Sequence, residues 1–206
     1  MQGLPATTAG AARFRRLCTT RFHGSISRAR HARVDAVYVV HATKALIDKV
    51  GLTDPAAVVE STSLLGPWYA TIAKGRPQLA LFVNEATLLP VLMPLAPSRS
   101  LNRRFPEALA RVLATHGVDQ AVIDAELEAM EYDVTRKTSS RSMAGMLVEF
   151  TFLARHALDQ TPNVDLTELS VELASTPCSP LYKRSVSPDR ELAAFLASRP
   201  KGLEIP

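Results

Sequence analysis

The chain has 206 residues, 47% of them hydrophobic and 21% charged, a composition that excludes wholesale disorder, collagen-like repeats and a disulfide-rich scaffold. Its formal net charge of +4 comes from residues 1–34, which hold seven Arg and no acidic residue, whereas residues 35–206 hold 17 Lys and Arg against 20 Asp and Glu. The net charge of −3 over residues 35–206 excludes a global field that would steer nucleic acids to that part of the chain.

Residues 1–34 are rich in Ala, Arg, Ser and Thr and show no sustained apolar periodicity. Three interpretations stay open: an organellar transit peptide, a basic arm that binds nucleic acid, and an unstructured tail. In the third case translation would start near Val34, at a codon that reads as Val internally. We favour the third, so the predicted organisation is a basic disordered tail or start-site artefact over residues 1–34 and a single α+β domain over residues 35–206.

The two cysteines and the apolar runs bear on location and cofactors. Cys18 and Cys178 form no CxxC motif and no cluster at metal-ligand spacing, and a reducing compartment suits them. No apolar run reaches the roughly 18–20 residues that span a bilayer. We therefore expect a cytoplasmic protein with no metal, no cofactor and no membrane contact.

Strands predominate in the first half of the chain. Val37–Val40 is a β-branched run that predicts a strand, and residues 44–50 predict a short helix between a Thr43 N-cap and a Gly51 stop. Residues 52–66 are expected to be loop. Three further strands form a predicted antiparallel meander: Trp68–Ala73, Gln78–Val83 and Thr87–Met93. Pro90 cannot donate a ladder hydrogen bond, so the third of these strands is an edge strand or carries a bulge.

Helices predominate in the second half. Apolar spacing and capping residues predict four of them: one that opens at Phe105 and Pro106, one from Asp119 to about Met130, one from about Ser142 to Leu158, and one over Asp189–Ser198. Between them, Tyr132–Arg136 is predicted as a strand. Leu166–Ala174 suits a strand or a short helix, and we favour the strand. The fold class is therefore α+β, with a small antiparallel sheet (the three-stranded meander plus one to three further strands) packed against about four to five helices.

Two helical faces carry further expectations. Phe152 and Leu153 broaden the apolar surface of the longest helix, so we expect it to be the central and most buried one. The helix that ends near Met130 has an acidic face, formed by Asp124, Glu126, Glu128 and Glu131. That face predicts a solvated helix surface.

The most suggestive polar segment is Lys137–Ser142, directly before the longest predicted helix. Lys137, Thr138, Arg141 and Ser142 would combine charge and hydroxyl donors with the free N–H groups and dipole of a helix start, which favour an anion. The alternative is that Ser139 or Ser140 only caps the helix while the two cations lie in solvent. The glycines of a P-loop are absent.

A second polar cluster lies in the predicted meander. Trp68 and Tyr69 could stack on a base, Arg76 adds a charge, and Asn84 and Glu85 form a turn in which Glu85 could act as a general base. The alternative is that the Trp packs in the core and the Asn-Glu pair only turns the chain. No nucleophile elbow, metal motif or dinucleotide fingerprint accompanies them, so Glu85 is the one catalytic candidate.

Several segments, in this order, resemble a known family: Ala42–Asp48, Trp68–Ala70, Leu79–Glu85 with Thr87–Val91, Lys137–Thr138, Arg141–Ser142, Gly145–Met146, Ala174–Cys178 and Ser187–Arg190. Through them the chain from about Val37 to Leu196 resembles a bacterial family of uncharacterised proteins, the domain of unknown function 6933. The resemblance implies a bacterial protein and leaves residues 1–34 outside the match, which favours a start-site artefact. It carries no activity, although relatives that accompany plasmid- or transposon-borne genes suggest a gene pair.

Three functions follow from these residues. We prefer a non-enzymatic binding module that holds an anion, a nucleotide or nucleic acid at the start of the long helix, with Arg76 and Trp68 assisting. The first alternative is an enzyme that acts on a phosphorylated or nucleic-acid substrate, with Glu85 as base while Lys137 and Arg141 stabilise developing negative charge. The second is a protein-interaction partner from a mobile-element gene pair, which would use the acidic helix face and the edge strand that contains Pro90.

Overall fold

The structure is a computed structural model that describes residues 36–51 and 60–199. The predictions for residues 1–34, for Cys18 and for residues 52–59 lie outside the described residues. No helix in the described ranges is both long and apolar enough to cross a membrane.

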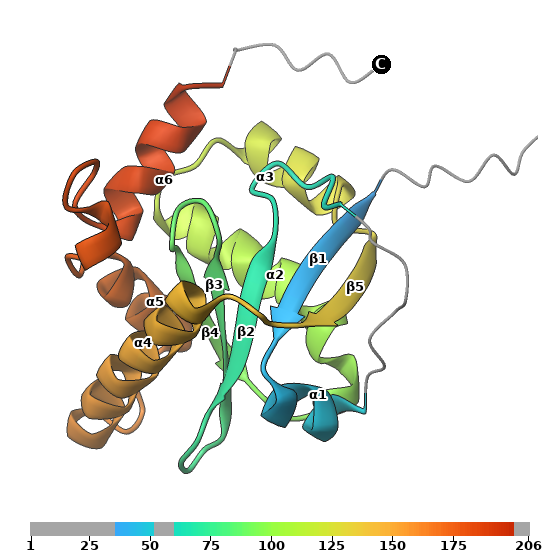
Figure 1. Cartoon of the computed structure of the whole chain (residues 1–206). Helices are drawn as coiled ribbons and strands as arrows, with labels where there is room; N and C mark the ends of the chain where they lie inside the picture. The colour runs from blue at the N-terminus through green and yellow to red at the C-terminus, as the bar shows by residue number, and fades with distance from the viewer. Residues whose placement is uncertain (1–35, 52–59, 200–206) are drawn as a thin grey trace, which may run out of the picture. The chain divides into compact units, whose positions relative to one another are not determined.

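The described residues contain five strands and six α-helices, joined by loops and two short 3-10 helices (Figure 1). The strands are β1 Val37–Ala42, β2 Trp68–Ala73, β3 Leu79–Asn84, β4 Pro90–Pro94 and β5 Tyr132–Lys137. The helices are α1 Lys44–Val50, α2 Leu101–Thr115, α3 Gln120–Glu128, α4 Arg141–Gln160, α5 Leu166–Ala174 and α6 Pro188–Ala197. The α+β class is confirmed, but the expected count of four to five helices is wrong because α5 forms where a strand was predicted.

The strands form one mixed sheet in the order β4-β3-β2-β1-β5. The predicted meander of β2, β3 and β4 is confirmed as antiparallel. The prediction of a wholly antiparallel sheet is wrong, because β1 lies between β2 and β5 and runs parallel to both. Parallel neighbours need crossover connections rather than tight turns, and here the connections contain α1, on the way to β2, and α2 with α3, on the way to β5.

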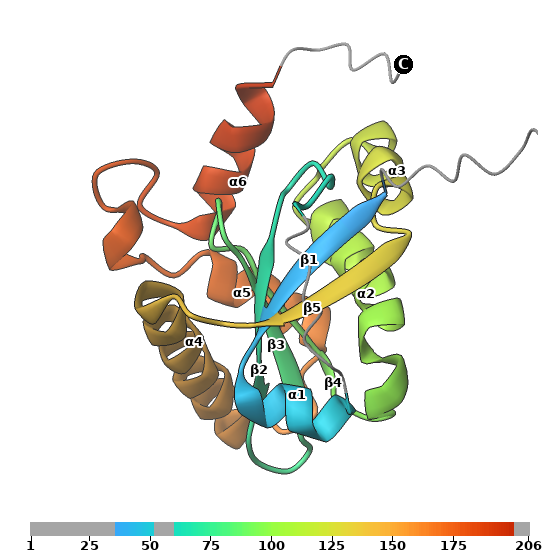
Figure 2. The same ribbon diagram turned by 45° about the vertical axis from the view of Figure 1, so that its right-hand side comes forward.

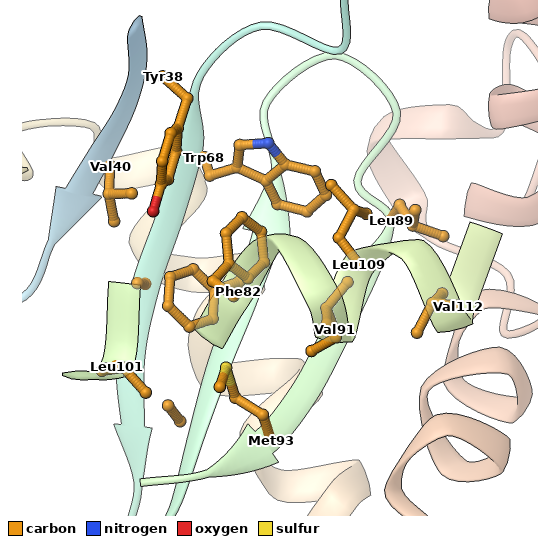
Figure 3. Close-up of a cluster of buried hydrophobic side chains, with 14 of the residues drawn as sticks. Tyr38, Val40, Trp68, Phe82, Leu89, Val91, Met93, Leu101, Leu109 and Val112 are labelled. Carbon is orange, nitrogen blue, oxygen red and sulfur yellow. The ribbon is translucent and has the colours of Figure 1, made fainter. Parts of the chain in front are cut away.

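Helices lie on both faces of this sheet, and the pleat sends alternate side chains to two apolar clusters (Figure 2). We call the first the α2-side cluster, which also takes in Leu46 and Val50 of α1. Figure 3 shows part of it, where Trp68 and Phe82 point toward α2. There the ring of Phe105 stacks on Phe82 at a centroid distance of 4.0 Å and meets Trp68 edge-on at 4.9 Å. The second, the α4-side cluster, packs α4 and α5 on Tyr69, Leu81 and Val83.

Strand β4 lies at one edge of the sheet, which confirms the prediction that Pro90 stands in an edge strand. The outward N–H groups of this edge strand are not free. Pro90 and Pro94 have no N–H, and the N–H of Leu92 between them donates to the Ser170 hydroxyl of α5 at 2.8 Å in a buried contact. Every outward N–H position from Pro90 to Pro94 is thereby absent or paired. A protein partner that added a strand to this edge, as one hypothesis expects, would find no free N–H donor between Pro90 and Pro94.

Helix α2 begins at Leu101, four residues before the predicted opening at Phe105, so Pro106 lies inside the helix. A proline there removes the N–H that the carbonyl of Asn102 would accept. The hydroxyl of Tyr38, from β1, donates to that same carbonyl at 2.8 Å. The sheet thus supplies the hydrogen bond that the proline removes, and the helix continues through it.

Two further expectations about helices are wrong. Leu166–Ala174 is helix α5 rather than a strand, since Asp165 caps it by accepting from the N–H groups of Thr167 and Glu168 at 2.7 and 3.1 Å. Helix α4 is not the most buried helix: its Val148 and Phe152 side chains are 71% and 69% exposed. Its packing is one-sided, against β2, β3 and α5.

Candidate functional site

The start of α4 stands where two parallel strands end. Strands β1 and β5 are neighbours, and the N–H of Thr138, which follows β5, donates to the carbonyl of Ala42 at 3.0 Å. After β1 the chain enters α1 on the α2 side, whereas after β5 it crosses to α4 on the other side (Figures 1 and 2). Parallel strands whose connections leave toward opposite faces create a crevice at their carboxyl ends, the usual place for ligands in open sheets.

Three polar side chains stand side by side on the α4 side of the sheet at this place. His41 is in register with Tyr69 on β2 and with Arg136 on β5, so all three project from the same face. The His41 and Tyr69 rings stack at a centroid distance of 4.8 Å and an angle of 26°. An imidazole, a phenol and a guanidinium therefore form one row across three strands.

This row is connected to the β3–β4 turn by a hydrogen bond and lies beside the N-cap of α4. The Ser140 hydroxyl accepts from the N–H of Met143, which makes Ser140 the N-cap, and its proximity lowers the pKa of Tyr69. Tyr69 in turn donates to Glu85 Oε1 at 3.1 Å. Burial, then the negative charge of Glu85, raises the pKa of Tyr69, so the phenol keeps its proton at neutral pH and acts as a donor.

The predicted segment Lys137–Ser142 divides between two faces. Lys137 is in register with Ala42, which belongs to the α2-side cluster, so its side chain projects away from Tyr69. The site side of β5 carries Arg136 instead. Arg141 and Ser142 are exposed in the first turn of α4, and Thr138 is half-buried with an Oγ1 atom that has no hydrogen-bond partner within the described ranges.

Trp68 and Asn84, two residues of the second predicted cluster, are buried and do not reach this place as ligand contacts. Trp68 is fully buried on the α2 side, where it has no access to a base. Asn84 is also fully buried: its amide donates to the carbonyl of Leu65, and its oxygen accepts from Thr87 N–H, Thr87 Oγ1 and Ala86 N–H. Trp68 thus packs in the core and Asn84 holds the turn, as the alternative interpretations of these two residues expected.

Arg76 and Glu85 stand at opposite ends of the β2–β3 hairpin. Arg76 is exposed in the turn after Ala73, whereas Glu85 follows Asn84, the partner of Trp68. The five residue steps of β2 span about 16 Å. Of the second predicted cluster, only Tyr69 and its hydrogen-bond partner Glu85 therefore lie at the α4 end of the hairpin.

The predicted acidic face of α3 is only partly solvated. Asp124, Glu128 and Glu131 are exposed, but Glu126 is 1% exposed and accepts from the N–H groups of Leu64 and Leu65 at 2.6 and 3.2 Å. Burial raises the pKa of Glu126 to about 7, although the two N–H donors lower it. Glu126 holds the segment before β2 in place through these two hydrogen bonds. Because it is buried, it cannot contribute to an acidic docking surface.

Two pockets among the described residues lie away from the start of α4. One pocket of about 520 Å³ lies between β4, α2 and the start of α5, and one of about 280 Å³ lies between the α2–α3 turn and α6. Neither contains a residue from the start of α4. No group of three or more His, Cys, Asp or Glu side chains within residues 36–51 and 60–199 could hold a metal ion.

His41, Arg136 and Ser140 are the site residues that sequence reasoning did not assign to a ligand. A strand over Tyr132–Arg136 was predicted, but the residue that faces the site depends on the face that β5 turns to α4. That face follows from pairing with β1, about 95 residues earlier, and no local pattern encodes it.

Comparison with known proteins gives one match. The model of a family described as domain of unknown function 6933 matches residues 39–191. No curated protein and no solved structure matches the chain.

Proposed function

Because the chain belongs to the domain of unknown function 6933 family, which brings no activity with it, we propose a function from geometry: the protein binds a phosphate-bearing ligand at the start of α4. The observation that carries the proposal is the position of this helix start, at the carboxyl ends of β1 and β5, beside the row of His41, Tyr69 and Arg136. The proposed role is binding rather than catalysis.

The backbone supplies the first contacts. The N–H groups of Arg141 and Ser142 precede the intrahelical ladder of α4, and the N–H of Met143 is already taken by Ser140. Two N–H groups and the positive end of the helix dipole thus favour an anion. Helix α4 has 20 residues, so this dipole is fully developed.

Side chains supply charge and hydroxyl groups. Arg136 projects from β5 on the same face as His41 and Tyr69, and a guanidinium can bind a phosphate through two parallel hydrogen bonds. The buried Thr138 Oγ1 offers a hydroxyl close to the same crossing. Glu85 brings a negative charge into the row through Tyr69, and this charge weakens anion binding.

The test compares neighbouring cations that project to opposite faces. Arg136→Ala should weaken the binding of a fluorescently labelled nucleotide or oligonucleotide about 10- to 100-fold in an anisotropy titration, because it removes a charged hydrogen-bond donor. Lys137→Ala, the matched control, should weaken it much less, and Glu85→Gln should strengthen it. Binding to the wild type should also fall with added salt. Equal effects of Arg136→Ala and Lys137→Ala, or no binding by the wild type, would contradict the proposal.

A second candidate function is catalysis on a phosphorylated or nucleic-acid substrate. The hydrogen bond from Tyr69 to Glu85 favours it, because it links a carboxylate to the helix start where an anion would lie. Incubation with a chromogenic phosphodiester and phosphomonoester tests it. Turnover that Glu85→Gln abolishes would establish Glu85 as the base, and no turnover at high protein concentration would leave only the binding function.

A further inference from the structure

The outer face of α4 carries two large apolar side chains in solvent. Val148 and Phe152 are 71% and 69% exposed, one turn apart on the helix. The buried residues of α4, among them Met143, Leu147 and Phe150, lie on the opposite side. Figures 1 and 2 both show α4 at the periphery, with none of the described elements on its outer side. Contiguous exposed apolar patches mark interaction surfaces, and Val148 and Phe152 form the apolar part of one on this helix.

Opposite charges bracket this pair at equal spacing. Arg141 lies seven residues before Val148, and Asp159 lies seven residues after Phe152. At 3.6 residues per turn, residues 141, 145, 148, 152 and 159 fall within about 60° of one another around the helix axis. All five are exposed. The outer stripe of α4, as we call these five residues, is basic at one end, apolar in the middle and acidic at the other end.

We propose that the outer stripe of α4 pairs with the same stripe of a second copy of this chain, in antiparallel orientation about a two-fold axis level with Phe150. This inference does not rest on the proposed ligand site. Antiparallel pairing about that axis brings Val148 of one copy level with Phe152 of the other. It also brings Arg141 level with Asp159 at both ends, which gives two ion pairs.

The pattern selects a copy of the chain over an unrelated partner because it is complementary to itself. An isologous contact requires that one patch match its own image under a two-fold rotation, and the equal seven-residue spacings meet this requirement. A parallel pair would set Arg141 against Arg141 and Asp159 against Asp159. Phe152 leans toward the amino end of its own helix, so the two Phe152 rings approach each other across the axis.

The middle of the stripe also permits close approach. Gly145 adds no side chain, so the backbone there is open to a side chain of the other helix. Packed helices lie about 8–10 Å apart, and small residues permit the shorter distances. One helix pair falls short of the roughly 1,200 Å² of a stable interface, so we expect a dimer that dissociates on dilution.

Sedimentation velocity of the full chain over about three decades of concentration tests the contact, since a weak interface shifts with dilution. The wild type should pass from monomer to dimer, and Phe152→Asp should remain monomeric. Tyr182→Asp is the matched control, since Tyr182 is 61% exposed and lies outside α4. Both residues are exposed, so neither change should unfold the protein. A wild type that is monomeric throughout, or equal loss of the dimer in both variants, would overturn the proposal.

Charge reversal tests the antiparallel orientation. Arg141→Asp and Asp159→Arg should each weaken dimerisation about tenfold or more, because each replaces two ion pairs by two like-charge contacts. The double variant Arg141→Asp/Asp159→Arg restores opposite charges and should dimerise as the wild type does. No recovery in the double variant would overturn the antiparallel pairing.

Cysteine cross-linking tests the register independently. In a Cys18→Ser background, where Cys178 is buried, a mixture of Val148→Cys and Phe152→Cys chains should form the mixed disulfide under mild oxidation. Symmetric disulfides from each variant alone, in place of the mixed one, would indicate parallel helices and contradict the proposal.

Discussion

Glu126 should make the folded protein less stable as the pH rises. Its carboxyl group is buried, with Oε2 held by two backbone N–H groups of the segment before β2, while Oε1 has no hydrogen-bond partner in the described parts of the chain. Burial raises its pKa from 4.5 to about 7, against the opposing effects of those donors and of Arg199. The folded state therefore favours the protonated acid.

The sign and size follow from proton linkage. Between pH 4.5 and about 7 the folded state keeps a proton that the unfolded chain has lost, so the free energy of unfolding falls as the pH rises. The contribution is complete below pH 4.5 and is lost above about pH 7. A pKa raised from 4.5 to about 7 corresponds to about 3 kcal/mol, at roughly 1.4 kcal/mol for each pKa unit. Because the group is buried, solvent screening does not reduce this value.

Glu126→Gln is the variant that isolates the effect. It keeps an oxygen that can accept from Leu64 and Leu65 but cannot ionise. Urea unfolding, followed by the emission of the single Trp, should show that the wild type loses about 3 kcal/mol more than the variant between about pH 5 and pH 8. Burial also lowers the pKa of His116, but the contribution of this group is common to both proteins and cancels in the difference. The same pH dependence in both proteins would refute the reasoning.

Three further changes test contacts of the sheet and its turns. Gly75→Ala should cost about 2 kcal/mol or more, because Gly75 has φ +143 and the added Cβ would collide with the guanidinium of Arg155. Ser170→Ala should cost about 1–3 kcal/mol, because it leaves the Leu92 N–H of the edge strand buried without an acceptor. Asn84→Ala should cost about 3 kcal/mol or more, because several buried hydrogen bonds are lost together. Urea unfolding at neutral pH measures all three.

Exposed neighbours provide the controls for these variants. Lys74→Ala, Ser175→Ala and Glu85→Gln alter residues beside Gly75, near Ser170 and next to Asn84, and each should stay within about 0.5 kcal/mol of the wild type. A test variant that unfolds no more easily than its control would show that the assigned contact does not contribute. Lys74→Ala also tests whether Gly75→Ala acts through the turn as a whole.

The local parts of the fold could be predicted from the sequence because local chemistry determines them. Gly51 ends α1 with φ 76, Asp119 caps α3 by accepting from the N–H of Ala121, and Ser140, one of two candidates, caps α4. Leu166–Ala174 shows where this reasoning fails. Its alternation of apolar and polar residues suits a strand or a short helix. The side-chain cap at Asp165 favours the helix.

The site was harder to predict because side-chain direction depends on distant pairing. Arg136 and Lys137 are adjacent and equally basic, and the register of β5 on β1 alone sends the first toward Tyr69 and the second toward the α2-side cluster. Trp68 and Tyr69 divide in the same way, since one is buried against Phe105 while the other joins the row at the start of α4. The start of the long helix, Tyr69 and Glu85 were predicted as site features, but His41 and Arg136 were not.

The parallel placement of β1 has a consequence for the order of folding. Val37 and Tyr132 pair although they are 95 positions apart (132 − 37), whereas Trp68 and Asn84 are 16 apart (84 − 68). Closing the longer loop costs more chain entropy, so pairings close in sequence form first. We expect the meander to nucleate and the β1–β5 half, with His41 and Arg136, to assemble last. Pulse-labelled hydrogen exchange during refolding should protect β3 amides before β5 amides, and simultaneous protection would contradict this order.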